Sequence, residues 1–325
     1  MGFFLFVYVF VAVVDPWGVL PLSPPLPRVP ISTNARFSFP ALARSPAFDA
    51  AVFGTSTTRL LRPAILNGLF GAHFVNLAMN SATAWEQSRM LALFAHAHPA
   101  ARMVIIGLDG AWCNMAPQES SGRPFPRWMY AGSPWRGYRE VANLYAVQEA
   151  ANQFAVLVGM KRPRYGLDGY TDFLPDERLY DPVRVAQIFA QWGPAPDIPT
   201  IPGAVHVFPA LSMLAKDLAA LPAGTRKLLF FTPSHVDLQG NPGSDIAAVN
   251  AACKSAVASI AAGAPGTEVV DFLIPSPITR DRDNYWDPLH YRVPIADRIM
   301  RDLAAASQGR PSEDDRLLVP ADGAS

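Results

Sequence analysis

The sequence predicts an α/β fold in which a mostly parallel sheet lies between two layers of helices. Five short apolar runs alternate along the chain with longer segments of helical periodicity, a pattern typical of parallel strands joined by helices. The runs lack polar alternation, so each suits a strand that is buried on both faces. Half of the 325 residues are hydrophobic and only 17% are charged, which allows one large core.

The expected elements can be placed by residue range. The predicted strands are residues 48–54, 72–78, 101–109, 226–233 and 267–274. The predicted helices between and after them are residues 81–98, 207–222, 245–263 and 294–307.

The same pattern predicts the domain organisation. Residues 112–205 break the alternation, because they are rich in aromatic residues and hold one long helical pattern at 139–159. We therefore expect one domain over residues 47–308 that contains a mostly helical insertion at about 112–205. The polar residues 309–325 are expected to form a flexible tail.

Residues 1–22 are predicted to form a membrane anchor or an uncleaved signal. The run GFFLFVYVFVAVV is apolar throughout, although it is shorter than the ~20 residues of a full span and lacks the basic start of a signal peptide. The Pro-rich residues 23–46 would then be a linker that holds the domain off the bilayer. Arg28, Arg36 and Arg44 follow the run and by positive-inside counting favour a cytoplasmic domain, whereas the chemistry below favours a periplasmic one.

Charge and cysteine content exclude some classes of function. Lys plus Arg and Asp plus Glu balance at 27 each, so we expect no nucleic-acid partner. Cys113 and Cys253 form no metal motif. They could pair, but we expect two buried free thiols. No metal or organic cofactor is implied.

The first predicted strand ends in a candidate nucleophile. Loops at the carboxyl ends of parallel strands converge on one edge of the sheet, where active sites of such folds lie. FGTSTTRLL places Ser56 two residues after Gly54 and directly before an expected helix start. The unpaired N–H groups of a helix N-terminus suit both an activated serine and an oxyanion. Alternatively, Thr55, Ser56 or Thr57 is simply the helix N-cap.

The next two junctions also carry polar residues. The second strand runs into NLAMNSATAWEQ, with Asn80 and Ser81 before a helix, and the third ends in Asp109 between two glycines. Residues of these types usually form turns. Three such junctions in succession at one edge of a sheet indicate a site.

Two later segments supply histidines. The fourth strand ends near His235, and DNYWDPLHYR holds Asp287 three residues before His290. A nucleophilic serine needs a nearby base, and the base needs a carboxylate that orients it. Asp287 can orient His290 within one loop, and His235 is a second candidate base. A structural histidine bonded to a backbone carbonyl is the alternative.

Together these segments resemble the blocks of the SGNH (GDSL) hydrolase superfamily. The resemblance covers residues 48–110 and 226–306 and implies a flavodoxin-like, three-layer α/β/α sheet. It also implies a catalytic triad of Ser56 as nucleophile, His290 as base and Asp287 as the orienting carboxylate. Backbone N–H groups of the serine and of a second-block glycine, with a third-block asparagine, form the oxyanion hole in that family.

This sequence departs from the family pattern at three positions. Thr55 replaces the aspartate of Gly-Asp-Ser, Ser81 aligns with the second-block glycine, and Asp109 replaces the third-block asparagine. An ionised Asp109 cannot donate to an oxyanion. Either Asn80 or Asn114 supplies the missing donor, Asp109 is protonated, or the activity is weak. The residues expected on the oxyanion or substrate-binding side are Asn80, Ser81, Asp109, Thr57 and His235.

The resemblance implies ester chemistry through an acyl-serine. The acyl group would pass to water or to a sugar hydroxyl, so the substrate would be an acylated glycan or a small ester. The anchored layout resembles the alginate-acetylation type of SGNH-like proteins, which implies a periplasmic domain and envelope assembly partners. Aromatic residues of the insertion would suit sugar stacking, although such clusters more often form a core. They are Trp112, Trp128, Trp135 and Tyr138.

Two other functions stay open. One is a catalytically inactive SGNH-like scaffold or glycan-binding component of a polysaccharide assembly system, which the three departures favour. The other, a flavodoxin-like nucleotide binder, is disfavoured because no Gly-rich phosphate loop follows the first strand.

Overall fold

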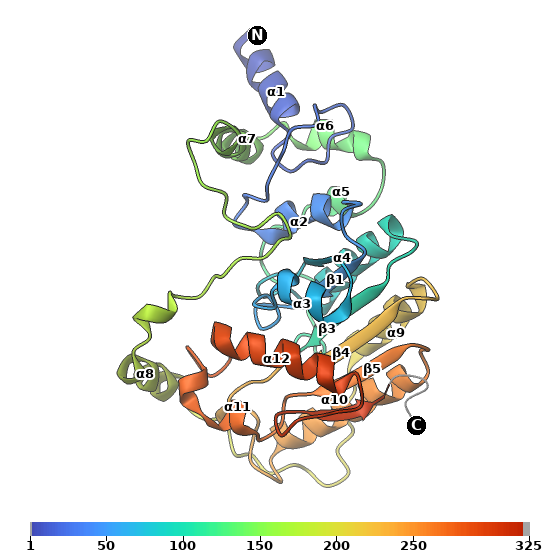
Figure 1. The fold of residues 1–325 in the computed structure, drawn as a ribbon, viewed down its shortest axis with the longest axis vertical. Helices are drawn as coiled ribbons and strands as arrows, with labels where there is room; N and C mark the ends of the chain where they lie inside the picture. The colour runs from blue at the N-terminus through green and yellow to red at the C-terminus, as the bar shows by residue number, and fades with distance from the viewer. Residues whose placement is uncertain (1, 321–325) are drawn as a thin grey trace.

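A six-stranded sheet forms the centre of the molecule, in a computed structural model that describes residues 2–320 (Figure 1). The strand order is β2-β1-β3-β4-β5-β6, and all neighbours are parallel except β5 and β6. The predicted α/β class with a mostly parallel sheet is thereby confirmed, and each predicted strand range contains one strand. The strands are β1 (Ala50–Phe53), β2 (Phe74–Asn76), β3 (Met103–Leu108), β4 (Arg226–Phe231), β5 (Thr267–Asp271) and β6 (Arg316–Val319).

Helices cover both faces of this sheet. Successive residues of a strand point to opposite faces, so Val52 belongs to one hydrophobic cluster and Phe53 to the other. Both are almost fully buried, which agrees with the apolar sequence of β1. The Val52 side is covered by α3 (Pro63–Phe70) and α12 (Val293–Ala306), and the Phe53 side by α4 (Ala84–Ala97), α9 (Pro209–Ala220) and α10 (Asp245–Ala262). The arrangement is compatible with a three-layer α/β/α fold.

Residues 112–205 fold as helices and loops, and the described part of this segment contains no strand of the sheet. They do not form one cap. Helices α6 and α7 lie near the N-terminal helix α1 and α5 lies beside α2, whereas α8 lies apart from them near one end of α12 (Figure 1). The elements are α5 (Arg127–Tyr130), η1 (Pro134–Arg136), α6 (Gly137–Glu140), α7 (Leu144–Leu157), η2 (Glu177–Leu179) and α8 (Pro182–Trp192).

The segment expected to be a linker is packed into the domain. Residues 23–46 include helix α2 (Ala35–Ala43), which begins at the N-cap Asn34 and has Phe39 and Ala43 fully buried. Helix α1 (Gly2–Val14) is also held, since the Tyr8 hydroxyl donates to the Tyr138 carbonyl at 2.9 Å. Apolar residues between the prolines of this segment give it a buried face, so it does not act as a spacer.

The predicted flexible tail contains a strand. β6 pairs antiparallel with β5, and Asp315 accepts the hydroxyl and backbone N–H of Ser312 just before it. The run RLLV is short, and its strand character depends on the free edge of β5, which the local sequence does not reveal. Residues 321–325 lie outside the described part of the chain.

The two cysteines form a disulfide, which corrects the expectation of free thiols. Cys113 and Cys253 are 140 residues apart, yet their Cα atoms lie 5.7 Å apart. The fold packs the loop after β3 against α10 and brings the two side chains together. Sequence separation alone could not show this proximity.

One described helix, α10, is long and apolar enough to cross a membrane by length and composition, with a mean hydropathy of 1.2. It packs along the sheet with Cys253, Val257 and Ala261 buried. Helix α1 is shorter and more apolar, at 13 residues. These two helices give only a weak indication of membrane association.

Candidate active site

A cavity of about 620 Å³ lies at the carboxyl ends of β1, β2 and β3. This is the edge at which the sequence places its polar junctions. Among the residues that line the cavity are Ser56, Asn80, Ser81, Asp109 and His290.

Ser56 lies on a turn, and not at the helix start expected from the sequence. Thr58 and Arg59 donate backbone hydrogen bonds back to Thr55 and Ser56, and α3 begins only at Pro63. The tight turn depends on Gly54, which has φ +150°, because a Cβ there would lie 2.3 Å from the Thr58 hydroxyl oxygen. The helix-dipole argument for Ser56 therefore does not apply.

Ser56, His290 and Asp287 form a continuous chain of hydrogen bonds. His290 Nε2 lies 2.9 Å from Ser56 Oγ, and His290 Nδ1 lies 2.8 Å from Asp287 Oδ2. A carboxylate at Nδ1 favours the tautomer with its proton there, which leaves Nε2 free to accept the serine proton. This arrangement would allow His290 to accept a proton from Ser56.

The loop around His290 is fixed by its own carboxylate. Asp287 Oδ1 accepts the backbone N–H groups of Leu289 and His290 at 2.8 and 2.9 Å. Burial tends to raise the pKa of Asp287, but the His290 contact and these two donors lower it below its usual value. Asp287 is therefore ionised at neutral pH and can stabilise a positively charged imidazole.

Tyr291 joins the two halves of the site. Its side chain is fully buried, and its hydroxyl donates to the Thr57 carbonyl in the turn that carries Ser56. Phe173, from the insertion, places its ring edge-on to His290 at 5.8 Å between centroids. The Tyr291 hydrogen bond thus joins the turn of Ser56 to the loop of His290, and Phe173 packs against the His290 ring.

Asp109 lies in the same cavity and accepts every hydrogen bond that its side chain makes within the described chain. The Thr55 hydroxyl donates to Oδ2, the Thr57 hydroxyl lies 3.4 Å from the same atom, and the Ala111 N–H donates to Oδ1 at 2.9 Å. Burial raises the pKa of Asp109, and these donors oppose the shift. The Thr57 hydroxyl thus donates to Asp109, while the Thr57 carbonyl accepts from Tyr291.

Asn80 is oriented by a buried arginine. Arg59 Nη1 donates to Asn80 Oδ1 at 2.9 Å, and an arginine side chain has only donors to offer. The amide oxygen of Asn80 must therefore face Arg59, and the amide N–H₂ forms no hydrogen bond within the described chain. Asn80 also lines the cavity, so this N–H₂ is a donor available there.

Arg59 itself has no carboxylate partner among the described residues. It is 3% exposed, and its guanidinium lies 5.1 Å from the ring of Tyr165 and 5.9 Å from that of Phe173. Burial lowers the pKa of Arg59. The aromatic rings and the Asn80 oxygen hold this cation in place.

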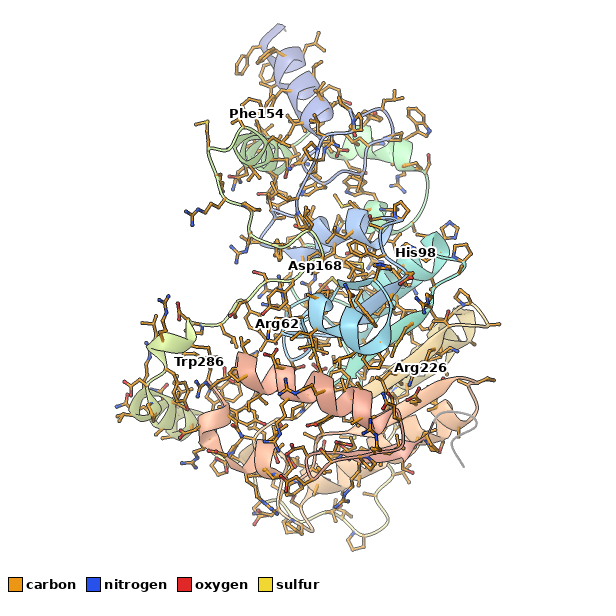
Figure 2. All side chains as sticks on the ribbon, viewed as in Figure 1. Arg62, His98, Phe154, Asp168, Arg226 and Trp286 are labelled. Atoms are coloured by element: carbon orange, nitrogen blue, oxygen red, sulfur yellow. A yellow bond between two sulfur atoms is a disulfide. The ribbon has the colours of Figure 1, made fainter. Side chains whose placement is uncertain are left out.

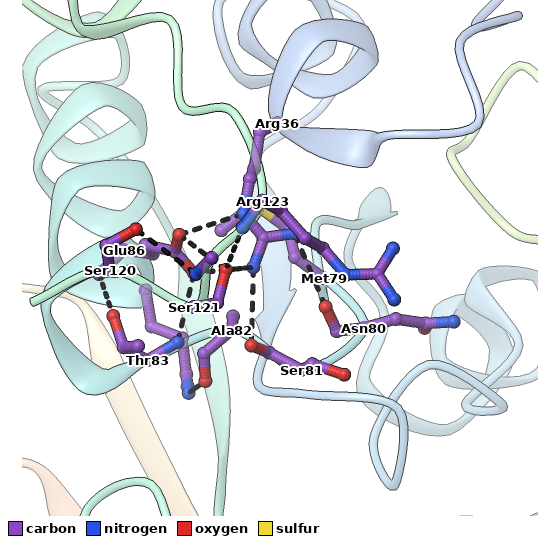
Figure 3. A network of polar contacts seen from close by, with 12 residues as sticks. Arg36, Met79, Asn80, Ser81, Ala82, Thr83, Glu86, Ser120, Ser121 and Arg123 are labelled. Carbon is purple, nitrogen blue, oxygen red and sulfur yellow. Dashed lines mark hydrogen bonds and ion pairs between the residues drawn. The ribbon is translucent and has the colours of Figure 1, made fainter. Parts of the chain in front are cut away.

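Ser81 adopts a backbone conformation that favours glycine. Its φ is +54°, in the left-handed region. The carbonyls of Asn80 and Ser81 accept from Arg36, which forms a buried ion pair with Glu86 (Figure 3). Neither the Ser56 nor the Ser81 backbone N–H donates a hydrogen bond within the described chain.

His235 does not line the cavity, which corrects its expected role in substrate binding. It is 3% exposed and packs between the rings of Phe189 and Tyr285. The His235 Nδ1 atom accepts the backbone N–H of Asp237, and the backbone N–H of His235 donates to the Pro288 carbonyl at 2.8 Å. Burial lowers the pKa of His235. It supports the backbone beside Asp287 as part of the core.

The aromatic residues proposed for sugar stacking lie elsewhere. None of the four lines the cavity at Ser56. Trp112 is buried and donates to Gln87 at 3.0 Å, whereas Trp128, Trp135 and Tyr138 belong to the α5–α6 region near α1.

The sequence alone did not single out Arg59, Tyr291, Phe173 or the Arg36–Glu86 pair. Arg59 lies in the segment of Ser56 and Tyr291 directly follows His290, so their nearness in sequence to these residues could have indicated them. Arg36 and Glu86 are 50 residues apart, and only the fold brings them together.

Within residues 2–320, no group of three or more His, Cys, Asp or Glu side chains is arranged to hold a metal ion. No family model matches the chain, and no curated protein is significantly similar to it.

Proposed function

We propose that this protein is a serine-dependent ester hydrolase or O-acyl transferase of the SGNH type that acts on an acylated carbohydrate or a similar ester. The observation that carries the proposal is the hydrogen-bonded chain from Ser56 through His290 to Asp287. The left-handed Ser81 and the close packing of Gly54 and Gly107 around Thr58 add support, since they match the glycine positions of the resemblance.

The reaction proceeds in two halves through an acyl-serine. Ser56 Oγ attacks the ester carbonyl while His290 Nε2 takes its proton, and the same proton then passes to the departing alcohol oxygen as the ester bond breaks. In the second half, His290 takes a proton from water or from a sugar hydroxyl, whose oxygen attacks the acyl-serine. The proton returns to Ser56 as the acyl group leaves. Asp287 stabilises the imidazolium in both halves.

The oxyanion would be stabilised by three donors around Ser56. They are the backbone N–H groups of Ser56 and Ser81 and the amide N–H₂ of Asn80, which Arg59 turns toward the cavity. Asn80 thus replaces the third-block asparagine. Asp109 opposes this role while ionised, and its raised pKa favours the neutral form.

An envelope location is part of the proposal. Disulfides persist in oxidising compartments, so the Cys113–Cys253 bond favours a domain outside the cytoplasm. The apolar helix α1, with Phe3, Phe4 and Phe6 exposed, would attach it to the membrane.

The second candidate function is an inactive SGNH-like scaffold or glycan-binding component. Asp109 favours it, because a carboxylate beside the nucleophile repels a developing oxyanion.

Acetate release separates the two functions. We expect wild-type protein to free acetate from aryl acetates or acetylated glycans, or to move it to an added glycan. Ser56→Ala should lower either rate by about 10³-fold or more, because the nucleophile is lost. Ser212→Ala, at an exposed serine on α9, is the matched control and should be neutral. Glycan binding without acetate release or transfer by the wild type would establish the scaffold function instead.

A further inference from the structure

One end of the molecule exposes apolar side chains on two different helices. The first turns of α1 project from the body, and Phe3, Phe4 and Phe6 are 73%, 78% and 70% exposed (Figure 1). Beside α1 lies α7, where five exposed residues recur at helical spacing along one face. They are Leu144, Gln148, Ala151, Phe154 and Val158 at its C-cap.

The exposed face of α7 carries no charge, while its opposite face is buried in the domain. Glu149 and Gln153 lie on the buried side, the reverse of the usual pattern for a surface helix. A helix with an uncharged outer face is suited to a medium other than water, although a protein partner would also satisfy it. The neighbouring cations decide between the two.

Three cations directly follow this face, in a stretch without acidic residues that Glu149 and Asp168 border. Residues 150–167 contain Lys161, Arg162 and Arg164 and no Asp or Glu. All three cations are exposed, and Met160 beside them is 81% exposed. The Lys161 ammonium group donates only to the neutral Asn152 side chain among the described residues. Apolar side chains bordered by unpaired cations match the boundary between lipid tails and anionic headgroups.

Helices α1 and α7 pack against each other at the same end of the molecule. The rings of Phe10 and Phe154 meet with centroids 5.9 Å apart, and Figure 2 shows Phe154 at the α1 end of the molecule. When the exposed first turns of α1 enter a bilayer, α7 is brought to its surface. Trp135, 56% exposed and stacked with Tyr138, lies in the adjoining α6 region, and amphipathic aromatic residues of this kind are enriched at membrane interfaces.

We infer that α7 is a second membrane-binding element, which lies in the headgroup region of an anionic phospholipid bilayer while α1 inserts beside it. The α1–α7 surface comprises the exposed apolar residues of the two helices, Met160 and the three cations at 161–164. The inference does not depend on catalysis at Ser56. It makes membrane attachment sensitive to lipid charge, which insertion of the uncharged α1 alone would not.

Vesicle flotation of the full chain tests this. The measured quantity is the ratio of partitioning into vesicles of phosphatidylcholine mixed with phosphatidylglycerol over partitioning into phosphatidylcholine alone. We expect a ratio well above unity for the wild type that falls as salt is added. Lys161→Glu/Arg162→Glu should lower the ratio by about 25-fold or more, since each basic residue near an anionic surface contributes about fivefold. Val158→Ser/Met160→Ser should lower binding to both kinds of vesicle.

Matched controls use exposed residues outside the α1–α7 surface. Arg184→Glu/Arg310→Glu makes the same change of charge, and Ile201→Ser/Val205→Ser removes the same kind of exposed apolar group. Both should bind like the wild type, and thermal unfolding by circular dichroism checks that every variant is folded. If Lys161→Glu/Arg162→Glu is misfolded, the single variant Lys161→Gln replaces it and should lower the ratio about fivefold. A ratio near unity for the wild type, or an equal loss in the charge controls, would overturn the inference.

Discussion

Asp109 is the residue at which this site differs most in chemistry from its proposed family. Its carboxylate shares a cavity with Ser56 and is held by Thr55, Thr57 and the Ala111 N–H. Each of these contacts is a donor, so the pocket around Asp109 is built for an acceptor. Burial at the same time raises the pKa of Asp109, which favours the neutral carboxylic acid.

Replacing this carboxylate should improve catalysis. Asp109→Asn keeps an oxygen for the threonine hydroxyls and removes the charge. Its N–H₂ takes the place of Oδ1, so the hydrogen bond from the Ala111 N–H is lost and a donor is added near the proposed oxyanion. We expect kcat for an aryl acetate to rise by about tenfold or more at alkaline pH, where Asp109 is ionised. The advantage should shrink as pH falls through the raised pKa of Asp109, because the wild-type side chain then becomes neutral too. Steady-state kinetics over a pH series measures both effects.

Asp109→Ala is the matched variant, because it removes the charge without supplying a donor. It should gain less than Asp109→Asn. If both variants instead lose activity to the same degree, the carboxylate is required and our account of this side of the site is wrong.

At the scale of elements, α4 and α9 meet at a buried carboxyl group. Asp217 on α9 accepts the hydroxyl of Ser88 on α4 at 2.9 Å, while its Oδ2 is buried without a partner. Burial raises the pKa of Asp217 to about 6. A folded-state pKa above the usual value of an aspartate means that folding favours the protonated form.

The folded state should therefore lose stability as the pH rises and the buried Asp217 side chain ionises. The destabilisation develops between about pH 4 and about pH 6 and stays constant above that range. Asp217→Asn should be close to neutral near pH 4 and stabilise the protein by about 1–3 kcal/mol near pH 8. Urea unfolding of both proteins at the two pH values measures this difference. Equal effects at the two values would show that Asp217 does not titrate in this way.

The elements themselves were largely predictable from local pattern. Mainly apolar runs marked all five parallel strands, since burial on both faces removes regular polar alternation. The helix predicted at residues 81–98 begins at Ala84, because Thr83 and Glu86 form a reciprocal capping box there. β6 was missed because RLLV is a strand only by virtue of the β5 edge beside it. The prediction of a helix directly after Ser56 was wrong, because the chain there forms a turn and α3 begins only at Pro63.

At the scale of the whole molecule, predictability falls with distance in sequence. Asp287 and His290 were recognisable because both contacts lie within one loop. The meeting of His290 with Ser56, 234 residues away, followed from the rule that parallel strands share a carboxyl edge. The Cys113–Cys253 bond and the Arg36–Glu86 pair follow no such rule, so they were missed or predicted wrongly. The packing of residues 23–46 likewise depends on distant segments, since α2 lies against both α4 and α5.

The central claim is that Ser56 is an activated nucleophile, and covalent labelling tests it most directly. Intact-mass spectrometry with peptide mapping, after incubation with a fluorophosphonate, locates any adduct. We predict one adduct per chain, on Ser56, absent in Ser56→Ala and formed about 10³-fold more slowly in His290→Ala. A folded wild-type protein that forms no adduct, or forms it on another residue, would contradict the account.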